Sequence, residues 1–385
     1  LLSIQRAIHA NAGVMTFFDP TRRSLLAAGL AATVWPNFGH AKDRSVQSSP
    51  WIDGLSFLPD DLADVTASGL NAMICDVSEV EEVKDAQGHP RYLRTFAAND
   101  RALDKALARI AGSSQVSLAL KGSDIGKRPG CAAFLQFQSC ETIGDDLTRI
   151  AYFHGKGLRV LQLTHHNDNL FAGGAIEPVQ SGLTPFGRDG IGEMNRVGIL
   201  PDVAHGSAQT IVEAARLSRT PIVYSHGACR AIVDNPRCIG DDGIRAIADG
   251  GGLVGIFMMS FWLTRDPVPK IDHFIAQIRH AANVGGIEAV AIANDFPMAG
   301  QSNMLRLKND NQEGVKEYLG WWRAMHARGV PGFEFTPEHV VIPELNSIKR
   351  MARIHQALAA AGFKSADLDK IMGANWSRVL NDVLG

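Results

Sequence analysis

Four strand-like segments of this sequence end on side chains that could bind a metal ion or move a proton. His165 and His166 end one segment, His205 and His226 end two others, and Asp295 ends a fourth. Neutral imidazole and carboxylate groups suit zinc, and a zinc-bound water has a pKa of about 7. The pattern predicts a metal-dependent hydrolase with His205, His226 and Asp295 as zinc ligands. Asp295 is also the predicted base that accepts the proton of the water.

Arg237 comes eleven residues after His226, in the loop that follows the same strand. A guanidinium at this place could bind a substrate carboxylate bidentately, although a surface arginine is the alternative. The other candidates also have alternatives: a histidine in an apolar segment can be a structural residue, and Asp295 can cap the loop that follows it.

The stretch from Arg196 to Arg237 shows how these groups are positioned. Two apolar runs, GILPDVA and TPIVYS, precede His205 and His226, and SAQTIVEAARLS between them has a Ser N-cap and apolar residues at helical spacing. This is a strand–helix–strand unit. A right-handed crossover makes the two strands parallel, so both histidines should lie at the same edge of one sheet.

The rest of the chain repeats this alternation of helices and strands, which predicts a parallel α/β fold. Nine strand candidates occur, and a (β/α)8 TIM-type barrel leaves one outside, for which we choose residues 116–121. Residues 299–343 are an insertion after the last barrel strand, expected to lie over the site as a lid or rim. Residues 347–362 and 365–384 are predicted to be helices on the outside of the barrel.

The N-terminal segment has the features of an export signal. Arg22 and Arg23 precede the apolar run LLAAGLAATVW, and small residues surround position 41. We predict a twin-arginine signal over residues 1–41, with Met15 as the true start, and a single domain over 42–385 that is exported to the periplasm. The run is too short for a stable membrane span. A formal charge of −2 gives no reason to expect nucleic acid as a partner.

Longer stretches resemble the membrane (renal) dipeptidase family of zinc metallopeptidases. They run from LTHHNDNLFAGG at residue 163 to GGGLVGI at 256, and AVAIANDF and IMGANWSRVLNDV are also similar. The resemblance implies a distorted (β/α)8 barrel with two zinc ions and a bridging hydroxide that attacks a dipeptide carbonyl. It makes His205 and His226 ligands of one zinc, His165 a catalytic substrate contact, Arg237 the carboxylate-binding residue and Asp295 the proton-transferring group. Members are often dimers, so a homodimer is possible.

The sequence departs from the family at the other zinc ion. The family's first strand reads DGHND, whose His and Asp are ligands, whereas this chain has Leu55 and Phe57 at those places. The bridging glutamate aligns with Gln138, and a neutral amide is a poor bridge between two cations. His166-Asn167-Asp168 has the spacing of the missing pair but follows a different strand. We therefore expect a divergent member with one zinc ion.

Two readings of the function remain. The first is an exported metal-dependent hydrolase that cleaves a dipeptide or a similar small amide. The second is a barrel that has lost catalysis and binds a small carboxylate ligand through Arg237. Cys229 and Cys238 flank the loop after His226 and are either a disulfide in an oxidising compartment or two ordinary buried thiols.

Overall fold

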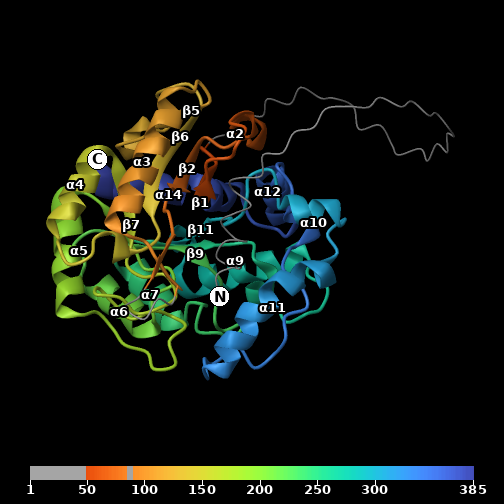
Figure 1. The fold of residues 1–385 in the computed structure, drawn as a ribbon. Coiled ribbons are helices and arrows are strands. Elements are labelled where there is room, and N and C mark those ends of the chain that lie inside the picture. Colours follow the sequence, from red (N-terminus) through yellow and green to blue (C-terminus); the bar gives the residue numbers. More distant parts are fainter. Residues whose placement is uncertain (1–48, 85–89) are drawn as a thin grey trace, which may run out of the picture.

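The computed structural model describes residues 49–84 and 90–385 and shows a nearly closed barrel of eight parallel strands (Figure 1). The predicted export signal lies outside the described residues. Neighbouring strands around the barrel are β1 (Ile52–Phe57), β2 (Ala72–Asp76), β6 (Cys131–Phe137), β7 (Leu158–Gln162), β8 (Leu200–Asp202), β9 (Val223–Gly227), β10 (Leu253–Ile256) and β11 (Val290–Ile292). The strand β5 (Val116–Leu118) pairs with β6 outside the barrel, which confirms the predicted odd strand.

Polar groups close the barrel between its first and last strands. The backbone N–H of Asp295 donates to the carbonyl of Leu55 at 3.0 Å. The buried carboxylate of Asp53 accepts two hydrogen bonds from Asn294, one from its backbone N–H and one from its side-chain amide, both at 2.8 Å. This contact places the ends of β1 and β11 side by side. Asp53 is therefore used for the closure of the barrel.

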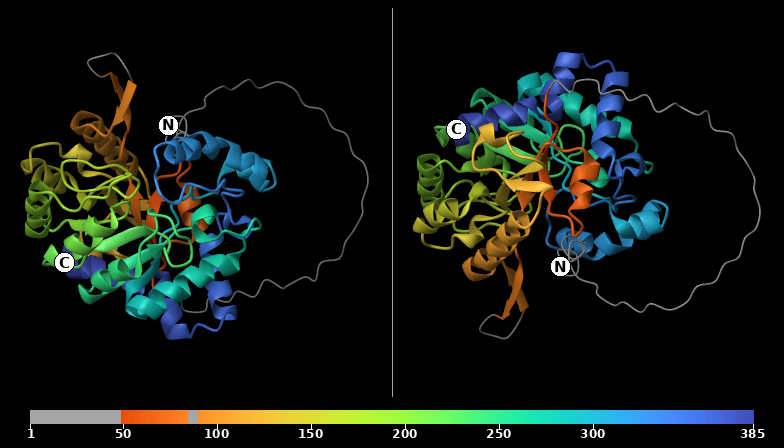
Figure 2. Two further views of the ribbon diagram at one scale, coloured as in Figure 1. Left: turned by 90° about the horizontal axis from the view of Figure 1, so that it is seen from below. Right: turned by 90° about the horizontal axis from the view of Figure 1, so that it is seen from above.

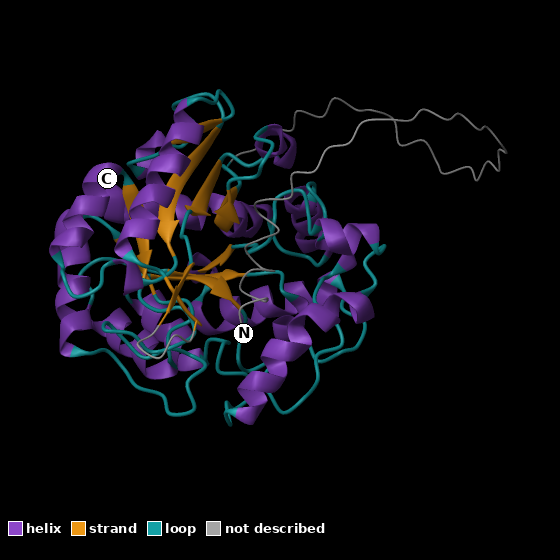
Figure 3. Cartoon of the chain, in the orientation of Figure 1, coloured by secondary structure: helices purple, strands orange, loops and turns teal. Residues whose placement is uncertain are grey.

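Helices surround the strands on the outside, as Figure 3 shows. In chain order they are α2 (Ala63–Ser68), α3 (Phe96–Ala111), α4 (Thr148–Lys156), α5 (Pro185–Val197), α6 (Ala208–Leu217), α7 (Asp241–Asp249), α8 (Ser260–Leu263), α9 (Ile271–Gly285) and α12 (Arg350–Ala360). The hydroxyl of Ser207 accepts from the N–H of Thr210 at 3.0 Å, which confirms the predicted N-cap of α6. Among the helices of the described ranges, none is long and apolar enough to cross a membrane.

The C-terminal helices correct one prediction. α13 (Ser365–Asp369) leads through residues 370–374 into α14 (Asn375–Leu384), which packs against the amino ends of the strands rather than on the outside of the barrel. Trp376, Val379 and Leu380 belong to the apolar cluster inside this end of the barrel. The Trp376 indole donates to the carbonyl of Ile292 at 2.9 Å. A Cβ at Gly54 would lie 2.1 Å from the Trp376 ring, so only glycine fits there.

A hairpin interrupts the alternation early in the chain. β3 (Glu81–Lys84) and β4 (Pro90–Leu93) form a separate two-stranded antiparallel sheet that projects from the barrel (Figure 2). The sequence does not predict this hairpin, because the segment lacks the run of apolar residues that marks a strand packed on a core.

The insertion after β11 contains α10 (Ser302–Arg306) and α11 (Asn311–Ala327). The ring of Trp321, in α11, lies 5.6 Å from the ring of His166 and 6.1 Å from that of Trp262. The insertion therefore borders the carboxyl edge of the barrel, as predicted for a lid or rim.

Candidate active site

Three of the candidate residues have a strained backbone. His166, His205 and Asp295 have φ angles of 70°, 64° and 53°, a region that only two other described non-glycine residues occupy. A non-glycine residue there costs about 1–3 kcal/mol and persists where the surroundings hold it. The strain lies in the turns directly after β7, β8 and β11, at the carboxyl edge of the barrel. This is where barrel enzymes carry their chemistry.

The histidines form one contiguous cluster across three strand ends. Nε2 of His205 lies 2.9 Å from Nε2 of His226, and Nδ1 of His205 lies 3.1 Å from Nδ1 of His166. The ring of His165 stacks on that of His205 with a centroid separation of 4.3 Å. The predicted convergence of these side chains is confirmed. Burial is the largest cause that lowers the pKa of His166, His205 and His226 well below the usual range, so these imidazoles are neutral.

Arg237 lies in the same cluster, fully buried. Its Nη2 donates to Nε2 of His205 at 2.9 Å and to the carbonyl of His226 at 3.2 Å, and Nη1 donates to the Tyr224 hydroxyl at 2.7 Å. The Tyr224 hydroxyl in turn donates to the carbonyl of Arg237 at 2.6 Å. The guanidinium thus faces the site. Its charge is a second cause that lowers the pKa of the three histidines.

A buried carboxylate orients His226 through a serine. Asp202 accepts from the Gln136 amide at 2.7 Å, from the Ser225 hydroxyl at 2.5 Å and from the backbone N–H groups of Ala204 and Ser225 at 2.9 and 3.0 Å. Four donors converge on this carboxylate, so it acts as an acceptor throughout. The Ser225 hydroxyl donates to Asp202 and must accept from Nδ1 of His226, 2.8 Å away. We assign the proton of His226 to Nδ1, which leaves a lone pair on Nε2.

The same reasoning assigns the proton of His205. Arginine has no acceptor, so Nε2 of His205 must accept the bond from Arg237. Neutral His205 then carries its proton on Nδ1 and donates it to His166. His166, to which we gave no role from the sequence, therefore orients His205.

Nε2 of His205 and Nε2 of His226 consequently both lack a proton although they lie only 2.9 Å apart, and the Arg237 guanidinium is the cation beside them. Such a pair repels unless a cation lies between or beside the two atoms. Zinc–nitrogen bonds of about 2.0–2.1 Å in tetrahedral geometry place two ligand nitrogens about 3.3 Å apart. The donor pair fits a metal ion after a small adjustment. Arg237 would have to release Nε2 of His205 at the same time.

Asp295 does not join the histidines as predicted. Among the described residues, the group of three whose ligand atoms all lie within 4.8 Å of one another is His165, His166 and His205. One of these contacts is the Nδ1–Nδ1 hydrogen bond between His166 and His205, so we place the metal-binding lone pairs on His205 and His226 instead.

The carboxylate of Asp295 is partly buried near Arg237, and burial is the largest cause that raises its pKa to about 7. Asp76 and Asp53 raise it further, whereas Arg237 lowers it. A carboxyl group with this pKa is suited to accept and release protons at neutral pH.

The residues for a second metal ion do not fit. Leu55 is fully buried and Phe57 partly so, and neither has a donor atom for zinc. The carboxylate of Asp168 accepts from the backbone N–H of Gly174 at 2.8 Å and from the Ser181 hydroxyl at 3.0 Å. It therefore holds its own loop together rather than replacing the missing ligand.

One prediction from the sequence concerns two cysteines close to the site. All five cysteines are free and buried, and the thiols of Cys229 and Cys238 face the carbonyls of Gln277 and Trp262. The alternative of two buried thiols is the one observed.

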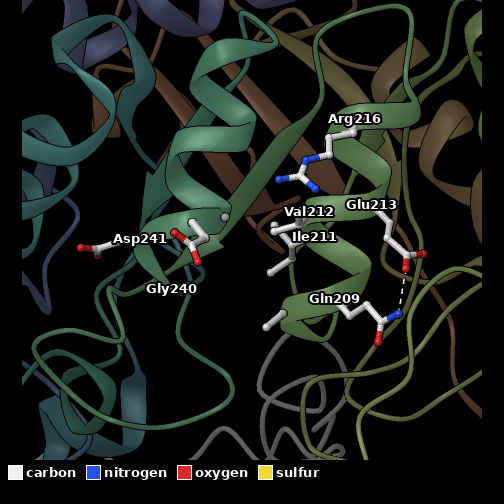
Figure 4. A pocket seen from close by; sticks show the side chains of 10 residues that line it. Gln209, Ile211, Val212, Glu213, Arg216, Gly240 and Asp241 are labelled. Carbon is white, nitrogen blue, oxygen red and sulfur yellow. Dashed lines mark hydrogen bonds between the residues drawn. The ribbon is translucent and has the colours of Figure 1, made fainter.

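A pocket of about 540 Å³ lies between α6 and α7 on the flank of the barrel. Figure 4 shows the Arg216 side chain turned toward this space, whereas Glu213 is held by Gln209 through a 2.8 Å hydrogen bond. The pocket holds none of the histidines. We therefore place the candidate site at the barrel mouth.

The barrel with histidines at the carboxyl ends of its strands defines the class, a (β/α)8 barrel of the metal-dependent hydrolase type. The chain belongs to the membrane dipeptidase family, peptidase family M19, whose family model matches residues 49–311.

Related proteins and structures agree with this assignment. The dipeptidase tcpJ of Claviceps purpurea is 26% identical over 313 residues, which are 78% of this chain and 63% of that protein. An uncharacterized dipeptidase of Schizosaccharomyces pombe is 32% identical over 148 residues, 37% of this chain and 36% of that protein. The chain thus spans less than two thirds of the length of these relatives.

Solved structures show the same fold. An amidohydrolase from Pseudomonas aeruginosa superimposes with a TM-score of 0.71 at 25% identity, covering 88% of this chain and 98% of that one. A metallo peptidase from Rhodobacter sphaeroides, solved with a phosphinate mimic of the dipeptide L-Ala-D-Ala, has a TM-score of 0.67 at 16% identity and covers 87% and 99%.

Proposed function

We propose that this protein hydrolyses the amide bond of a dipeptide or a similar small molecule and uses one zinc ion held by His205 and His226. The observation that carries the proposal is the 2.9 Å separation of Nε2 of His205 and Nε2 of His226, to neither of which the hydrogen-bond partners assign a proton. When bound there, zinc would lower the pKa of a water molecule and polarise the substrate carbonyl. Family membership supports the reaction class, and the phosphinate ligand of the Rhodobacter sphaeroides structure supports a dipeptide-like substrate.

The protein's own residues would then bind the substrate and move protons. Arg237 binds the substrate carboxylate with the donors that now hold His205, and Tyr224 keeps the guanidinium in place. Asp295 takes the proton of the attacking water and later gives a proton to the leaving amine, as its pKa of about 7 allows. His165, stacked on His205, lies where it would contact the tetrahedral centre.

Leu55, Phe57 and Gln138 leave the other half of the site without the ligands that the family uses. This observation favours a second candidate function, a barrel that binds a small carboxylate through Arg237 without catalysis.

In either case we propose that residues 1–41 direct export to the periplasm and that the mature chain begins at residue 42. A homodimer is part of the proposal on family grounds alone.

Elemental analysis of the full chain, purified with zinc present, tests the proposal. We expect about one zinc per chain, lost in His205→Ala and in His226→Ala but retained in the control His280→Ala. His280 lies on α9 and binds Asp241 at 2.8 Å, away from the cluster. Hydrolysis of alanine dipeptides should be lost with the zinc.

Each other outcome contradicts part of the proposal. Two zinc ions per chain would refute the single site and would require ligands that we have not identified. Zinc that survives both cluster variants would refute the assignment of His205 and His226. Absence of zinc from the unmodified protein would favour the carboxylate-binding barrel.

A further inference from the structure

Arg94 is a buried cation with two donor atoms that have no hydrogen-bond partner among the described residues. It follows β4, directly before Thr95, the N-cap of α3, and only 3% of its surface is exposed. Among the residues that the structure describes, no hydrogen-bond partner is found for its Nε and Nη2 atoms, and no carboxylate forms an ion pair with it. Burial of an unpaired guanidinium is unfavourable unless something compensates it. A ligand with an anionic group would supply that compensation.

Contacts on three neighbouring strands locate Arg94 at the carboxyl edge of the barrel. Its backbone N–H donates to the Glu141 carboxylate at 3.3 Å, and Glu141 lies in a short turn, Cys140–Thr142, just after β6. The charges that act on its guanidinium are those of Glu141 and of Asp76 at the end of β2. Its own charge acts on His166, which follows β7. The backbone contact with Glu141 thus places Arg94 near the carboxyl end of β6.

Arg94 and Arg237 come from different βα units of the barrel. Arg237 comes from the loop after β9 and packs against the rings of Phe257 and Trp262, and its buried Nε also has no partner. The charges of both arginines lower the pKa of His166. The site therefore presents two separate guanidinium groups with unused donors.

The charges of Asp76 and Glu141 act on Arg94, but neither carboxylate forms a hydrogen bond with Nε or Nη2 of its guanidinium. Asp76 accepts hydrogen bonds from the backbone N–H and the hydroxyl of Ser78 at 2.9 and 2.6 Å. Glu141 accepts from the backbone of Arg94 and lies outside ion-pair distance of its guanidinium. The pKa of Asp295 is lowered by the charge of Arg237, and Arg94 is not among the charges that act on it.

We infer that Arg94 binds an anionic group of the substrate, distinct from the carboxylate that Arg237 binds. The substrate is then a small amide with two carboxylates, such as a dipeptide whose amino-terminal residue has an acidic side chain. Arg94 also supplies a fixed positive charge in the half of the site where Leu55, Phe57 and Gln138 cannot hold a metal ion. The expectation that the substrate is an amide rests on the proposed function, whereas the expectation that it carries two anionic groups rests on Arg94 and Arg237.

Binding to the metal-free full chain tests the anion site without catalysis. The probes are glutarate and its monoamide glutaramate, which have nearly the same shape and differ by one negative charge. We expect calorimetry to show glutarate bound about tenfold to a hundredfold more tightly, as for hydrogen bonds to a charged group. Arg94→Gln should remove the difference and leave the affinity for glutaramate within about twofold. The control Arg101→Gln, on α3 with 69% of its side chain exposed, should keep it.

Equal affinity of the unmodified protein for the two probes would overturn the inference, as would a preference for glutarate that survives in a folded Arg94→Gln protein. If that variant does not fold, Arg94→Lys replaces it. Lysine keeps the charge but loses the planar fork, so the preference should fall severalfold. An unchanged preference in Arg94→Lys would also count against the inference.

Hydrolysis separates this inference from the proposed function. For the zinc-loaded protein we compare the dipeptides Glu-Ala and Gln-Ala, and expect a ratio of kcat/KM of at least about ten that falls to about one in Arg94→Gln. Equal rates with both dipeptides would refute the role of Arg94 and leave the hydrolase intact. Selective binding of glutarate without hydrolysis of any dipeptide would refute the hydrolase and leave Arg94 as an anion-binding residue.

Discussion

Replacement of Ser225 by alanine should loosen the orientation of His226. The serine is fully buried, and its hydroxyl links Asp202 at 2.5 Å to Nδ1 of His226 at 2.8 Å. Ser225→Ala removes one hydrogen bond to a charged group and one between neutral groups, and it leaves the His226 N–H without an acceptor. Together these losses should reduce the free energy of unfolding of the metal-free protein by about 2–4 kcal/mol.

The effect on metal binding follows from the same contact. With the serine present, the proton stays on Nδ1 and Nε2 keeps the lone pair that a metal ion needs. Without it, the imidazole can rotate and exchange tautomers, and loss of such an outer contact weakens metal affinity about 10–100-fold. Zinc affinity is measured by competition with a chelator, and the tautomer by the ¹⁵N chemical shifts of His226. The free energy of unfolding is measured by urea titration.

Ser56→Ala is the matched control. Ser56 is also a buried serine at the barrel mouth, on β1, but its hydroxyl has no hydrogen-bond partner among the described residues. Its removal should change zinc affinity less than about twofold, because no ligand depends on it. If Ser225→Ala matched this control in zinc affinity and kept the Nδ1–H tautomer, the assignment of the lone pairs would be wrong.

Two further predictions concern stability. The raised pKa of Asp295 means that folded protein holds a proton that the unfolded chain releases above about pH 4. The free energy of unfolding of the metal-free protein should therefore fall as the pH rises from 4 to 7. Over this range Asp295→Asn should gain stability relative to the unmodified protein, and the difference should be constant above pH 7. A difference that does not change between pH 4 and 7 would contradict the raised pKa. Gly54→Ala should destabilise by about 1–3 kcal/mol or more, because its Cβ would overlap the Trp376 ring. In a thermal scan, the exposed helical Gly192→Ala should instead stabilise by up to about 1 kcal/mol, and equal effects would argue against the overlap.

The barrel and the meeting of the histidines were predictable because both follow from local patterns. Strand–helix–strand alternation implies parallel strands, and parallel strands bring His205 and His226 to one edge however far apart they lie in the chain. The odd strand β5 was also predictable, since eight strands complete a barrel.

The orienting groups were not predictable in this way. Asp202 and Ser225 each look like an ordinary polar residue in a strand, and their function appears only when β8 pairs with β9 and brings them together. A weak signal existed, because an acidic residue inside an apolar run must find donors when it is buried. The sequence marked His166 as a histidine at a strand end but did not show its orienting role, and it gave no signal for Arg94, since both roles depend on distances across different βα units.

The position of α14 was wrong in the prediction for a related reason. Its apolar spacing shows that one face is buried, but not against which surface. A helix packed on the side of the barrel and a helix across its amino end have the same periodicity. The close packing of Trp376 against Gly54, more than 300 positions away in the chain, distinguishes the two arrangements, and it is visible only in the structure.

That position of α14 also has a consequence for folding. The helix carries Trp376 into the apolar interior at the amino ends of the strands, yet during synthesis it leaves the ribosome after every strand that it covers. A nascent chain with all eight strands outside the ribosome would still lack this part of its core. The contacts that complete the barrel join segments far apart in the chain, and such contacts slow folding. Assembly of this barrel is therefore expected to finish after translation of residues 375–384, and shortened chains that end before α14 should accumulate as aggregation-prone intermediates.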